Sequence, residues 1–295
     1  MPITQEQLAA RRAGIGSSDA ACIFGLGYHT ARSLWYDKTG RVPLEDEPPS
    51  EQARIGNMTE AVVLDMMAED LDVSIKTGIT FEHPDGINRS NPDAVVLNGD
   101  SGTITKPTTL AEAKSTGLPG WGDPEIANDV PERVLIQTHH QMYCTGAQLV
   151  YVPVLFGKFG LSFKVYRVER DDSLCALIAE RCLEWWQRHV VADTEPEGDI
   201  DLEVVKRVVR KPEKSIIIDD DVVDTWRQLR DQRLDVAKRE KAALANLVAM
   251  LGDAEVGLCN FGKFTYRTQH RKGYTVKPTS FPVASFKEKE GDDGA

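Results

Sequence analysis

The chain has 295 residues and a formal net charge of −11, and 41% of its residues are hydrophobic. It contains no run of about 18 apolar residues, and its first residues lack a basic stretch followed by an apolar one, so we expect neither a membrane span nor a signal peptide, and a cytoplasmic location. Its five scattered cysteines form no C-x-x-C pair, which argues against a disulfide framework and against an iron–sulfur cluster.

The first informative segment is residues 14–19, a glycine- and serine-rich stretch that precedes an apolar run. Ser17 or Ser18 in this position is typical of a helix N-cap. Free backbone N–H groups at a helix start, with Arg11 and Arg12 nearby, also suit a phosphate anion. The segment therefore predicts a helix start and a candidate anion site, with Arg11 preferred over Arg12.

Residues 51–71 are predicted to form a helix, because apolar side chains recur at helical spacing. These side chains are Ile55, Val62, Val63, Met66, Met67 and Leu71. Glu60 lies on this helix. A lone glutamate on such a helix is usually solvated, so the local pattern by itself gives Glu60 no role.

Two Pro-Asp pairs follow, and their surroundings differ. Residues 83–86 (His-Pro-Asp-Gly) are predicted to form a turn, because proline and glycine fix its corner. Asp93, after Asn91 and Pro92, instead runs directly into the strand pattern of residues 94–97. Asp93 is therefore the better candidate for a carboxylate at a strand terminus.

Residues 110–114 form a second apolar run, which carries Glu112 and Lys114 in the only acid-x-Lys triplet of the sequence. Side chains two apart on a strand share a face, so Glu112 and Lys114 point together while Ala113 turns into the core. Two acids and an ammonium at one strand edge are costly to hold together unless a divalent cation neutralises the acids. Carboxylate oxygens suit Mg²⁺ or Mn²⁺, and such sites cleave phosphodiesters.

A helix is predicted over residues 131–145, and it carries Gln137, His139 and His140. Such residues on a helix most often satisfy local backbone groups or face water. The two histidines lack partners at a spacing that suits zinc. The helix alone therefore does not reveal whether these side chains meet a substrate.

The next predicted elements are two strands, residues 149–156 and 161–169, and a helix over residues 174–190. Basic residues on the strands fit either a DNA groove or the protection of an edge strand against aggregation. Trp185 and Trp186 are predicted to pack in the core.

An acidic linker is predicted over residues 193–201, followed by strand-like segments at 204–210 and 215–218. A long helix is then expected over residues 221–251, ended by Gly252. Its apolar stripe comprises Trp226, Leu229, Leu244, Leu247, Val248 and Leu251, and Arg233, Lys238 and Glu240 interrupt any regular heptad. Packing on the chain's own domain is favoured over a free coiled coil, which stays open.

A hairpin of residues 255–260 and 263–269 is predicted next, with a tight turn at Phe261-Gly262. A basic cluster surrounds it, made of Arg267, His270, Arg271, Lys272 and Lys277. This cluster would extend a DNA path or dock a partner protein. Residues 287–295 are predicted to be a disordered tail.

Four separated motifs occur in a recognisable order over about two thirds of the chain: residues 11–21, residues 56–60 (Gly-Asn-Met-Thr-Glu), Asp93 with the Glu-x-Lys triplet, and residues 137–140 (Gln-Thr-His-His). This order resembles the YqaJ viral recombinase or phage lambda exonuclease family of the PD-(D/E)xK nuclease superfamily. The resemblance implies an α/β, restriction-endonuclease-like core with a central mixed sheet flanked by helices. It places an exonuclease domain at residues 1–195, and the predicted long helix and β-hairpin then form an extension at residues 196–286.

By this resemblance, the chain would digest one strand of double-stranded DNA from a 5′ end, in the 5′ to 3′ direction, with Mg²⁺ or Mn²⁺ in its place. Asp93, Glu112 and Ala113 would hold the metal. Lys114 would activate water and stabilise the transition state, and Glu60 would complete the acidic site. The terminal 5′ phosphate and adjacent DNA would be held by Arg11, Ser18, Asn91, Gln137 and His139. Family members are ring-shaped homotrimers around the duplex and work beside a single-strand annealing protein in homologous recombination.

The sequence departs from the family pattern at Ala94, where relatives often have glycine, and in residues 98–109, which fit a protruding hairpin. The net acidity also requires that basic residues concentrate in a channel, because phosphate neutralisation supplies most non-specific DNA affinity. Two alternatives stay open. One is a structure-specific or restriction-like endonuclease with the same metal site, and the other is a catalytically idle DNA-binding assembly module.

Overall fold

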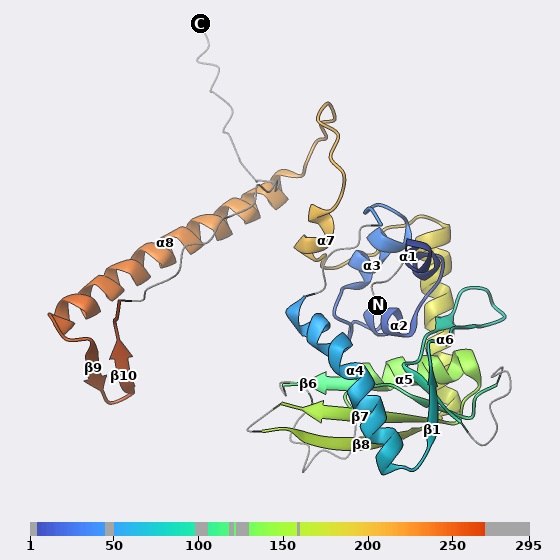
Figure 1. Cartoon of the computed structure of the whole chain (residues 1–295). Coiled ribbons are helices and arrows are strands. Elements are labelled where there is room, and N and C mark those ends of the chain that lie inside the picture. Colours follow the sequence, from blue (N-terminus) through green and yellow to red (C-terminus); the bar gives the residue numbers. More distant parts are fainter. Residues whose placement is uncertain are drawn as a thin grey trace, which may run out of the picture. The chain divides into compact units, whose positions relative to one another are not determined.

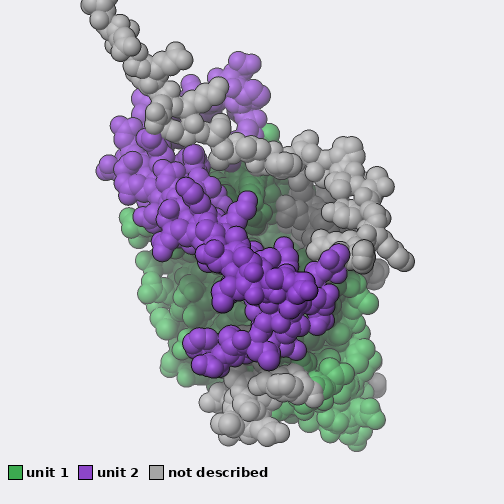
Figure 2. Space-filling model, turned by 90° about the vertical axis from the view of Figure 1, so that its left-hand side faces the viewer, with its two compact units in different colours: residues 1–209 green, residues 210–295 purple. Residues whose placement is uncertain are grey.

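The computed structural model describes residues 5–44, 50–97, 106–117, 121, 130–157 and 160–268. The chain divides into two compact units, residues 1–209 and residues 210–295, which Figure 2 colours separately. The hairpin predicted at residues 98–109 falls largely on residues outside the described part, as does the tail at residues 287–295. Among the described residues, no helix combines the length and apolarity that crossing a membrane requires.

The first unit begins with four helices, α1 (Gln5–Arg12), α2 (Ser17–Ile23), α3 (Ala31–Lys38) and α4 (Glu51–Asp70). The prediction that Ser17 or Ser18 caps α2 is wrong, because Gly16 is the N-cap. The Asp19 carboxylate accepts a hydrogen bond from the Gly16 N–H at 2.9 Å. Asp19 in the first turn thus satisfies the N-cap backbone N–H, as the acidic residue of a capping box does. The predicted helix at residues 51–71 is confirmed as α4.

A central mixed sheet contains β1 (Ser74–Thr77), β4 (Ala94–Leu97), β5 (Thr109–Ala111), β6 (Lys114–Thr116), β7 (Leu149–Phe156) and β8 (Ser162–Glu169). β4 is antiparallel to β1 and β5, both β5 and β6 are parallel to β7, and β8 is antiparallel to β7. The predicted hairpin of residues 149–156 and 161–169 is confirmed. Two short strands, β2 (Phe81–Glu82) and β3 (Arg89–Ser90), form a separate antiparallel pair.

Helices cover both faces of this sheet, with α4 on one face and α5 (Glu132–Thr145) and α6 (Asp172–Trp185) on the other (Figure 1). Strand residues alternate between two cores, as a period of two requires. Ala94, Val96 and Ala111 pack with Leu64 and Met67 of α4. The other core joins Val95, Leu110, Val150, Val152 and Val154 to Val134 and Met142 of α5. The predicted fold class, an α/β core with a mixed sheet flanked by helices, is confirmed.

β5 and β6 behave as one strand that is interrupted at Glu112 and Ala113. Their registers with β7 are continuous, since Ala111 pairs with Tyr151 and Lys114 pairs with Val154. The Glu112 N–H donates to the Tyr151 carbonyl at 2.9 Å. Pro153 then follows on β7, and a proline has no N–H with which to continue the ladder. The interruption therefore leaves the Ala113 N–H outside the ladder between the strands, at the predicted acid-x-Lys triplet.

The first unit ends with a π-helix (Trp186–Val191) and α7 (Leu202–Lys206). The prediction of a strand at residues 204–210 is wrong, because Val204 is buried in a helix that packs on α3. A short apolar pair among charges fits one helical turn as well as a strand, and the packing decides between them. The compact unit therefore continues beyond residue 195, where the sequence predicted the end of the exonuclease domain.

The second unit consists of α8 (Asp220–Leu251), β9 (Val256–Cys259) and β10 (Gly262–Thr265). Gly252 caps α8 with a positive φ of 58°, which glycine adopts at little cost. The long helix and the antiparallel hairpin are as predicted. Residues 215–218 form no strand. No residue of α8 is buried, and the expected packing of α8 on its own domain stays a prediction. Of the predicted basic cluster only Arg267 is described, in an ion pair with Glu255 at 3.2 Å.

Candidate active site

Asp93, Glu112 and Lys114 meet at the interruption between β5 and β6. Glu112 lies two residues after Leu110 and therefore faces α5, as Leu110 does. The Lys114 Nζ donates to Glu112 Oε1 at 2.5 Å. The Ala113 N–H donates to Asp93 Oδ2 at 2.8 Å, across the antiparallel pair of β4 and β5. The sheet thus places the two carboxylates and the ammonium at one edge.

Two glutamines of α5 hold the Glu112 carboxylate, which is only 4% exposed. Gln137 Nε2 donates to Oε1, and Gln141 Nε2 donates to Oε2, each at 2.6 Å. The Gln137 Oε1 in turn accepts from Lys114 Nζ at 3.2 Å. Glu112 is therefore oriented by charge-assisted hydrogen bonds, which are stronger than those between neutral groups.

The three acids of the site influence one another electrostatically. Burial raises the pKa of Asp93 well above its ordinary value, and repulsion from Glu112 and Glu60 raises it further. Burial also raises the pKa of Glu60, and the Glu112 charge adds to this rise. The pKa of Lys114 is lowered by burial but raised overall by Glu112 and Asp93. Carboxylates whose proximity raises their pKa values form an environment that a bound cation would relieve.

The donor set at this edge fits a divalent metal ion. Asp93 and Glu112 offer hard carboxylate oxygens, and Ala113 can contribute only its backbone carbonyl, which is also a hard donor. Among the described residues, no three carboxylate, imidazole or thiolate groups stand together in ligating positions. To bind the ion through Oε1, Glu112 would have to give up the hydrogen bond from Gln137 or the ion pair with Lys114. The residues that would hold the metal are therefore Asp93, Glu112 and Ala113.

The sequence model of the YqaJ-like viral recombinase domain matches residues 6–148, which include α2, α4, Asp93, the Glu-x-Lys triplet and most of α5. Residues 6–148 are thus similar to a YqaJ-like viral recombinase domain. The chain is also 33% identical over 200 residues to the uncharacterized protein YqaJ of Bacillus subtilis (strain 168). That similarity covers 66% of this chain and 59% of YqaJ, so the chain spans about three fifths of this relative.

Two solved structures of low sequence identity align with more than half of the chain. The alkaline exonuclease LHK-Exo from Laribacter hongkongensis is 20% identical, covers 64% of this chain and 94% of its own, and superposes with a TM-score of 0.46. A phage related exonuclease from Haemophilus somnus 129PT is 11% identical, with coverages of 61% and 96% and a TM-score of 0.43.

Glu60 of the YqaJ-like domain approaches the triplet from α4. Its neighbour Thr59 shares a hydrogen bond of 2.8 Å with Ser115, the residue after Lys114. The electrostatic influence of Glu112 and Lys114 on Glu60 is a second sign that these groups lie close together. The structure therefore brings Glu60 toward Asp93, Glu112 and Lys114, although no direct hydrogen bond joins Glu60 to them among the described residues.

Arg11, Ser18 and Asn91 are exposed at other points of the YqaJ-like domain. The Arg11 carbonyl accepts from the buried Lys38 Nζ at 2.7 Å, while Arg12 pairs with Asp37 at 2.9 Å. Asn91 Nδ2 donates to Thr80 at 2.6 Å. The guanidinium of Arg11 is thus more available than that of Arg12, in line with the sequence preference, but its role as a phosphate ligand stays a prediction.

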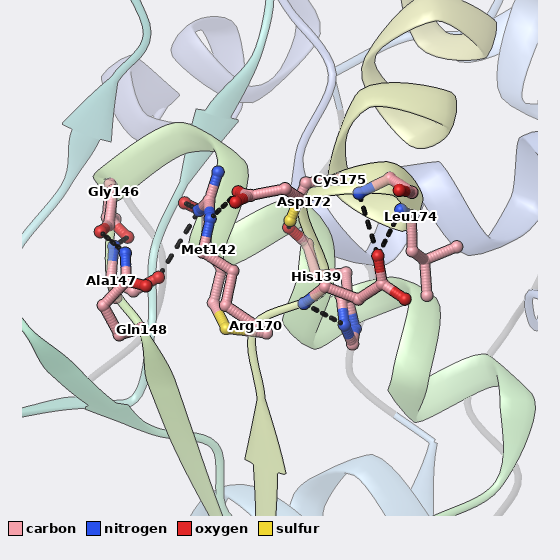
Figure 3. A network of polar contacts seen from close by, with 12 residues as sticks. His139, Met142, Gly146, Ala147, Gln148, Arg170, Asp172, Leu174 and Cys175 are labelled. Carbon is pink, nitrogen blue, oxygen red and sulfur yellow. Dashed lines mark hydrogen bonds and ion pairs between the residues drawn. The ribbon is translucent and has the colours of Figure 1, made fainter.

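His139 lies apart from the triplet, although Gln137 is only two residues away. Two residues on a helix face different directions, and His139 is 2% exposed. Its Nδ1 donates to the Leu135 carbonyl at 2.9 Å, and its Nε2 accepts from the Asp171 N–H at 3.3 Å. Figure 3 shows His139 among contacts that attach α5 to the start of α6. Both ring nitrogens therefore have partners inside the protein, and the predicted contact of His139 with DNA remains untested.

Gln141 is the site residue that the sequence analysis missed. It is 1% exposed and bonds Glu112 directly. The signal was available, because Gln137 and Gln141 are four apart on a predicted helix and so share a face. Tyr28 is a second missed neighbour, since its phenol is close enough to contribute to the raised pKa of Lys114.

Proposed function

We propose that this chain is a divalent-metal-dependent exonuclease that degrades one strand of double-stranded DNA from a 5′ end in the 5′ to 3′ direction. The convergence of Asp93, Glu112 and Lys114 at one sheet edge carries the proposal, because this donor set suits Mg²⁺ and phosphodiester hydrolysis. The match of residues 6–148 to a YqaJ-like viral recombinase domain supports it. When bound, the metal would activate a water and offset charge on the leaving oxygen.

The protein groups would divide the remaining tasks. Asp93, Glu112 and the Ala113 carbonyl would bind Mg²⁺ or Mn²⁺, and Gln137 and Gln141 would orient Glu112. The Lys114 ammonium would face the phosphoryl oxygen on which negative charge develops, where electrostatic stabilisation is most effective. Glu60 would complete the acidic side of the site. Arg11, Ser18 and Asn91 would bind the terminal 5′ phosphate through guanidinium, hydroxyl and amide groups.

The proposal extends to the assembly and setting of the enzyme. The substrate would be the end of a DNA duplex, and the exonuclease domain would form a homotrimeric ring around it. A ring encloses its duplex and needs less attraction per contact, which would suit a chain of net charge −11. A single-strand annealing protein would take up the product strand during phage-type homologous recombination in the cytoplasm.

The decisive experiment incubates the full chain with linear duplexes that carry a 5′ phosphate or a 5′ hydroxyl, and with a covalently closed circle, each with and without Mg²⁺. We expect Mg²⁺-dependent digestion of the linear DNA alone, faster from the phosphorylated end. Cutting of the circle would instead establish an endonuclease. Equal rates on the 5′-phosphate and 5′-hydroxyl duplexes would show that Arg11, Ser18 and Asn91 do not bind the terminal phosphate.

Substitution Lys114→Ala tests the chemistry within this reaction. Loss of the ammonium should lower the rate of strand digestion by at least about a thousandfold, because no other cation would stabilise the transition state at that position. Duplex binding, measured by fluorescence anisotropy in Ca²⁺, should persist. Undiminished digestion by the variant would remove the proposed mechanism, and binding without digestion by the wild-type chain would establish the idle module.

A further inference from the structure

The helix α8 exposes an apolar stripe, and the described residues bury none of its side chains. It runs for 32 residues without a buried position, and Figure 1 shows it as one long helix followed by the β9–β10 hairpin. Trp226 is 39% exposed and Leu229 is 61% exposed. Most helices gain their stability by burying such a face, so a helix that is exposed on all sides requires a further packing partner.

Six large apolar residues of α8, between Val222 and Leu251, occupy the same positions when counted from either end. The midpoint of the stripe lies between Val236 and Ala237. At equal distances from this midpoint stand pairs of large apolar residues: Leu229 with Leu244, Trp226 with Leu247, and Val222 with Leu251. At about 100° of rotation per residue, all these positions fall within roughly 60° of one line along the helix. These six positions are therefore symmetric about the midpoint, while Val248 of the stripe has Thr225 at its equivalent position.

Of the three charged residues that interrupt the heptad, the two that lie on the stripe obey the same symmetry, and Lys238 lies on the opposite side of α8. Arg233 and Glu240 lie at equal distances on either side of the midpoint and on the same line. They carry opposite charges, so two copies of the helix laid antiparallel would place each Arg233 against a Glu240 of the other copy. A parallel pair would set Arg233 against Arg233 and Glu240 against Glu240. Charged positions in a helix seam commonly set orientation and partner in this way.

We propose that α8 pairs antiparallel with α8 of a second copy of this chain. The two-fold axis passes between Val236 and Ala237. Each contact therefore occurs twice, for example Leu229 of one copy with Leu244 of the other and the reverse, as an isologous interface requires. The apolar residues beyond the Arg233 and Glu240 layers would close the seam at its two ends. Two successive four-residue steps in the seam, from Leu229 to Arg233 and on to Ala237, would locally unwind the supercoil.

This pairing goes beyond the proposed exonuclease activity and does not depend on it. It concerns the second unit alone. If the exonuclease domain forms a trimer, three such two-fold contacts would join two rings into a hexamer with dihedral symmetry. If that domain is monomeric, the full chain would be a dimer. The proposal therefore requires an even number of copies in either case.

Charge reversal at the seam tests the proposal in the full chain by sedimentation velocity. Arg233→Glu sets the introduced acid against Glu240 twice per interface, and Glu240→Arg has the converse effect, so each should halve the particle mass at an unchanged protein concentration. The double variant Arg233→Glu/Glu240→Arg restores opposite charges and should restore the wild-type mass. Circular dichroism of each variant would show that α8 remains helical.

Lys238→Glu is the matched control, because it makes the same change of charge as Arg233→Glu on the opposite side of α8. It should leave the mass unchanged. A wild-type chain with an odd number of copies, single variants with unchanged mass, or a double variant that stays dissociated would each overturn the pairing. A wild-type monomer would indicate that α8 packs on its own chain instead.

A cysteine test fixes the orientation. In a Cys259→Ser background, which removes the exposed thiol, Ala237→Cys would lie near its own copy at the two-fold axis and should form a disulfide dimer under mild oxidation. Leu244→Cys should not, since its partner is Leu229. Cross-linking of both variants to the same extent would indicate a parallel pair and would overturn the proposal.

Discussion

Two aspartates that each follow a proline, Asp85 and Asp93, occupy opposite environments in the first unit. Asp85 lies in the turn between β2 and β3, where the Gly86 N–H donates to the His83 carbonyl at 3.0 Å, which confirms the predicted turn. Asp93 lies at the start of β4 beside Glu112. Burial would raise the pKa of Asp85, but donors from Asn88 and Ile87 outweigh it and lower the pKa. The pKa of Asp93 is instead raised well above its ordinary value.

The difference lies in what surrounds each carboxylate. Asp85 accepts the N–H groups of Ile87 and Asn88 and the Asn88 amide, each at 2.8 Å, and it pairs with His83 at 2.8 Å. Asp93 accepts one backbone N–H and faces other acids. A carboxylate surrounded by donors stabilises its fold, whereas a carboxylate among acids is held at a cost that functional sites commonly bear. The comparison therefore separates a structural acid from a candidate catalytic one.

The largest effect is expected from asparagine substitution at each position. Asp93→Asn removes a proposed metal ligand while an amide oxygen can still accept the Ala113 N–H, so we expect DNA digestion to fall by about a thousandfold or more with the fold intact. Asp85→Asn should keep the rate per folded molecule within a few-fold. Digestion assays on linear duplex, normalised to the folded fraction by circular dichroism, measure both. Equal losses of DNA digestion in the two variants would show that Asp93 is no more catalytic than Asp85.

The second effect concerns stability, and here the larger loss is expected at Asp85 rather than at Asp93. Asp85→Asn turns one acceptor into an amide donor that opposes the Asn88 amide and the Tyr143 hydroxyl, which lies at 3.4 Å. We expect a loss of about 2 kcal/mol in the free energy of unfolding at neutral pH, as for a charged hydrogen-bond acceptor. Because the pKa of Asp85 is lowered from 3.8, this contribution is complete above that value and is lost as the pH falls through the folded pKa.

Urea denaturation over a pH series measures this loss. The difference between wild type and Asp85→Asn should narrow as the pH falls below 3.8, the ordinary value for the carboxyl. A difference that stays constant into acid would show that the charge of Asp85 contributes nothing and that the turn depends on shape alone.

The separation of the two aspartates could be predicted from the sequence, because proline and glycine mark the turn and an apolar run marks the strand. The pairing of Glu112 with Lys114 also follows from strand periodicity. What could not be predicted is the network that joins α5 to α2 and to the turn between β2 and β3. Ser17, His140, Asn88 and Asp85 are joined there by hydrogen bonds of 2.8 to 3.0 Å, across three separate segments.

This network also shows why His140 is structural. Asn88 donates its amide to Asp85, so its oxygen faces His140 Nε2, which must carry the proton, and Nδ1 accepts from the Ser17 hydroxyl. Burial lowers the pKa of His140 to about 4, so the ring stays neutral at physiological pH. The sequence placed both Gln137 and His139 at the DNA, and only the packed fold shows that Gln137 bonds Glu112 while His139 bonds backbone groups of its surroundings.

A third effect should appear when a divalent cation is added. If Asp93 and Glu112 bind Mg²⁺ or Mn²⁺, the folded wild type gains about 1.4 kcal/mol at ten times the dissociation constant, and the unfolded chain gains nothing. Thermal unfolding in Mn²⁺ and in a magnesium-free buffer of the same ionic strength measures the gain. Asp85→Asn, corrected for its own stability, should show the full gain and Asp93→Asn should show little. A gain of equal size in Asp93→Asn would place the ion elsewhere.

The smallest effect is a stabilisation of the metal-free protein by Asp93→Asn. A carboxyl whose pKa is raised in the fold makes the folded state lose stability as the pH rises from the ordinary value, 3.8, through the folded pKa. The amide removes that cost and keeps the bond to Ala113. Without divalent cations, Asp93→Asn should therefore be more stable than wild type at neutral pH, by less than the gain from Mn²⁺, and equal to it below pH 3.8. Urea denaturation in chelator at both pH values measures this, and lower stability of the variant at neutral pH would mean that Asp93, like Asp85, is a structural acid.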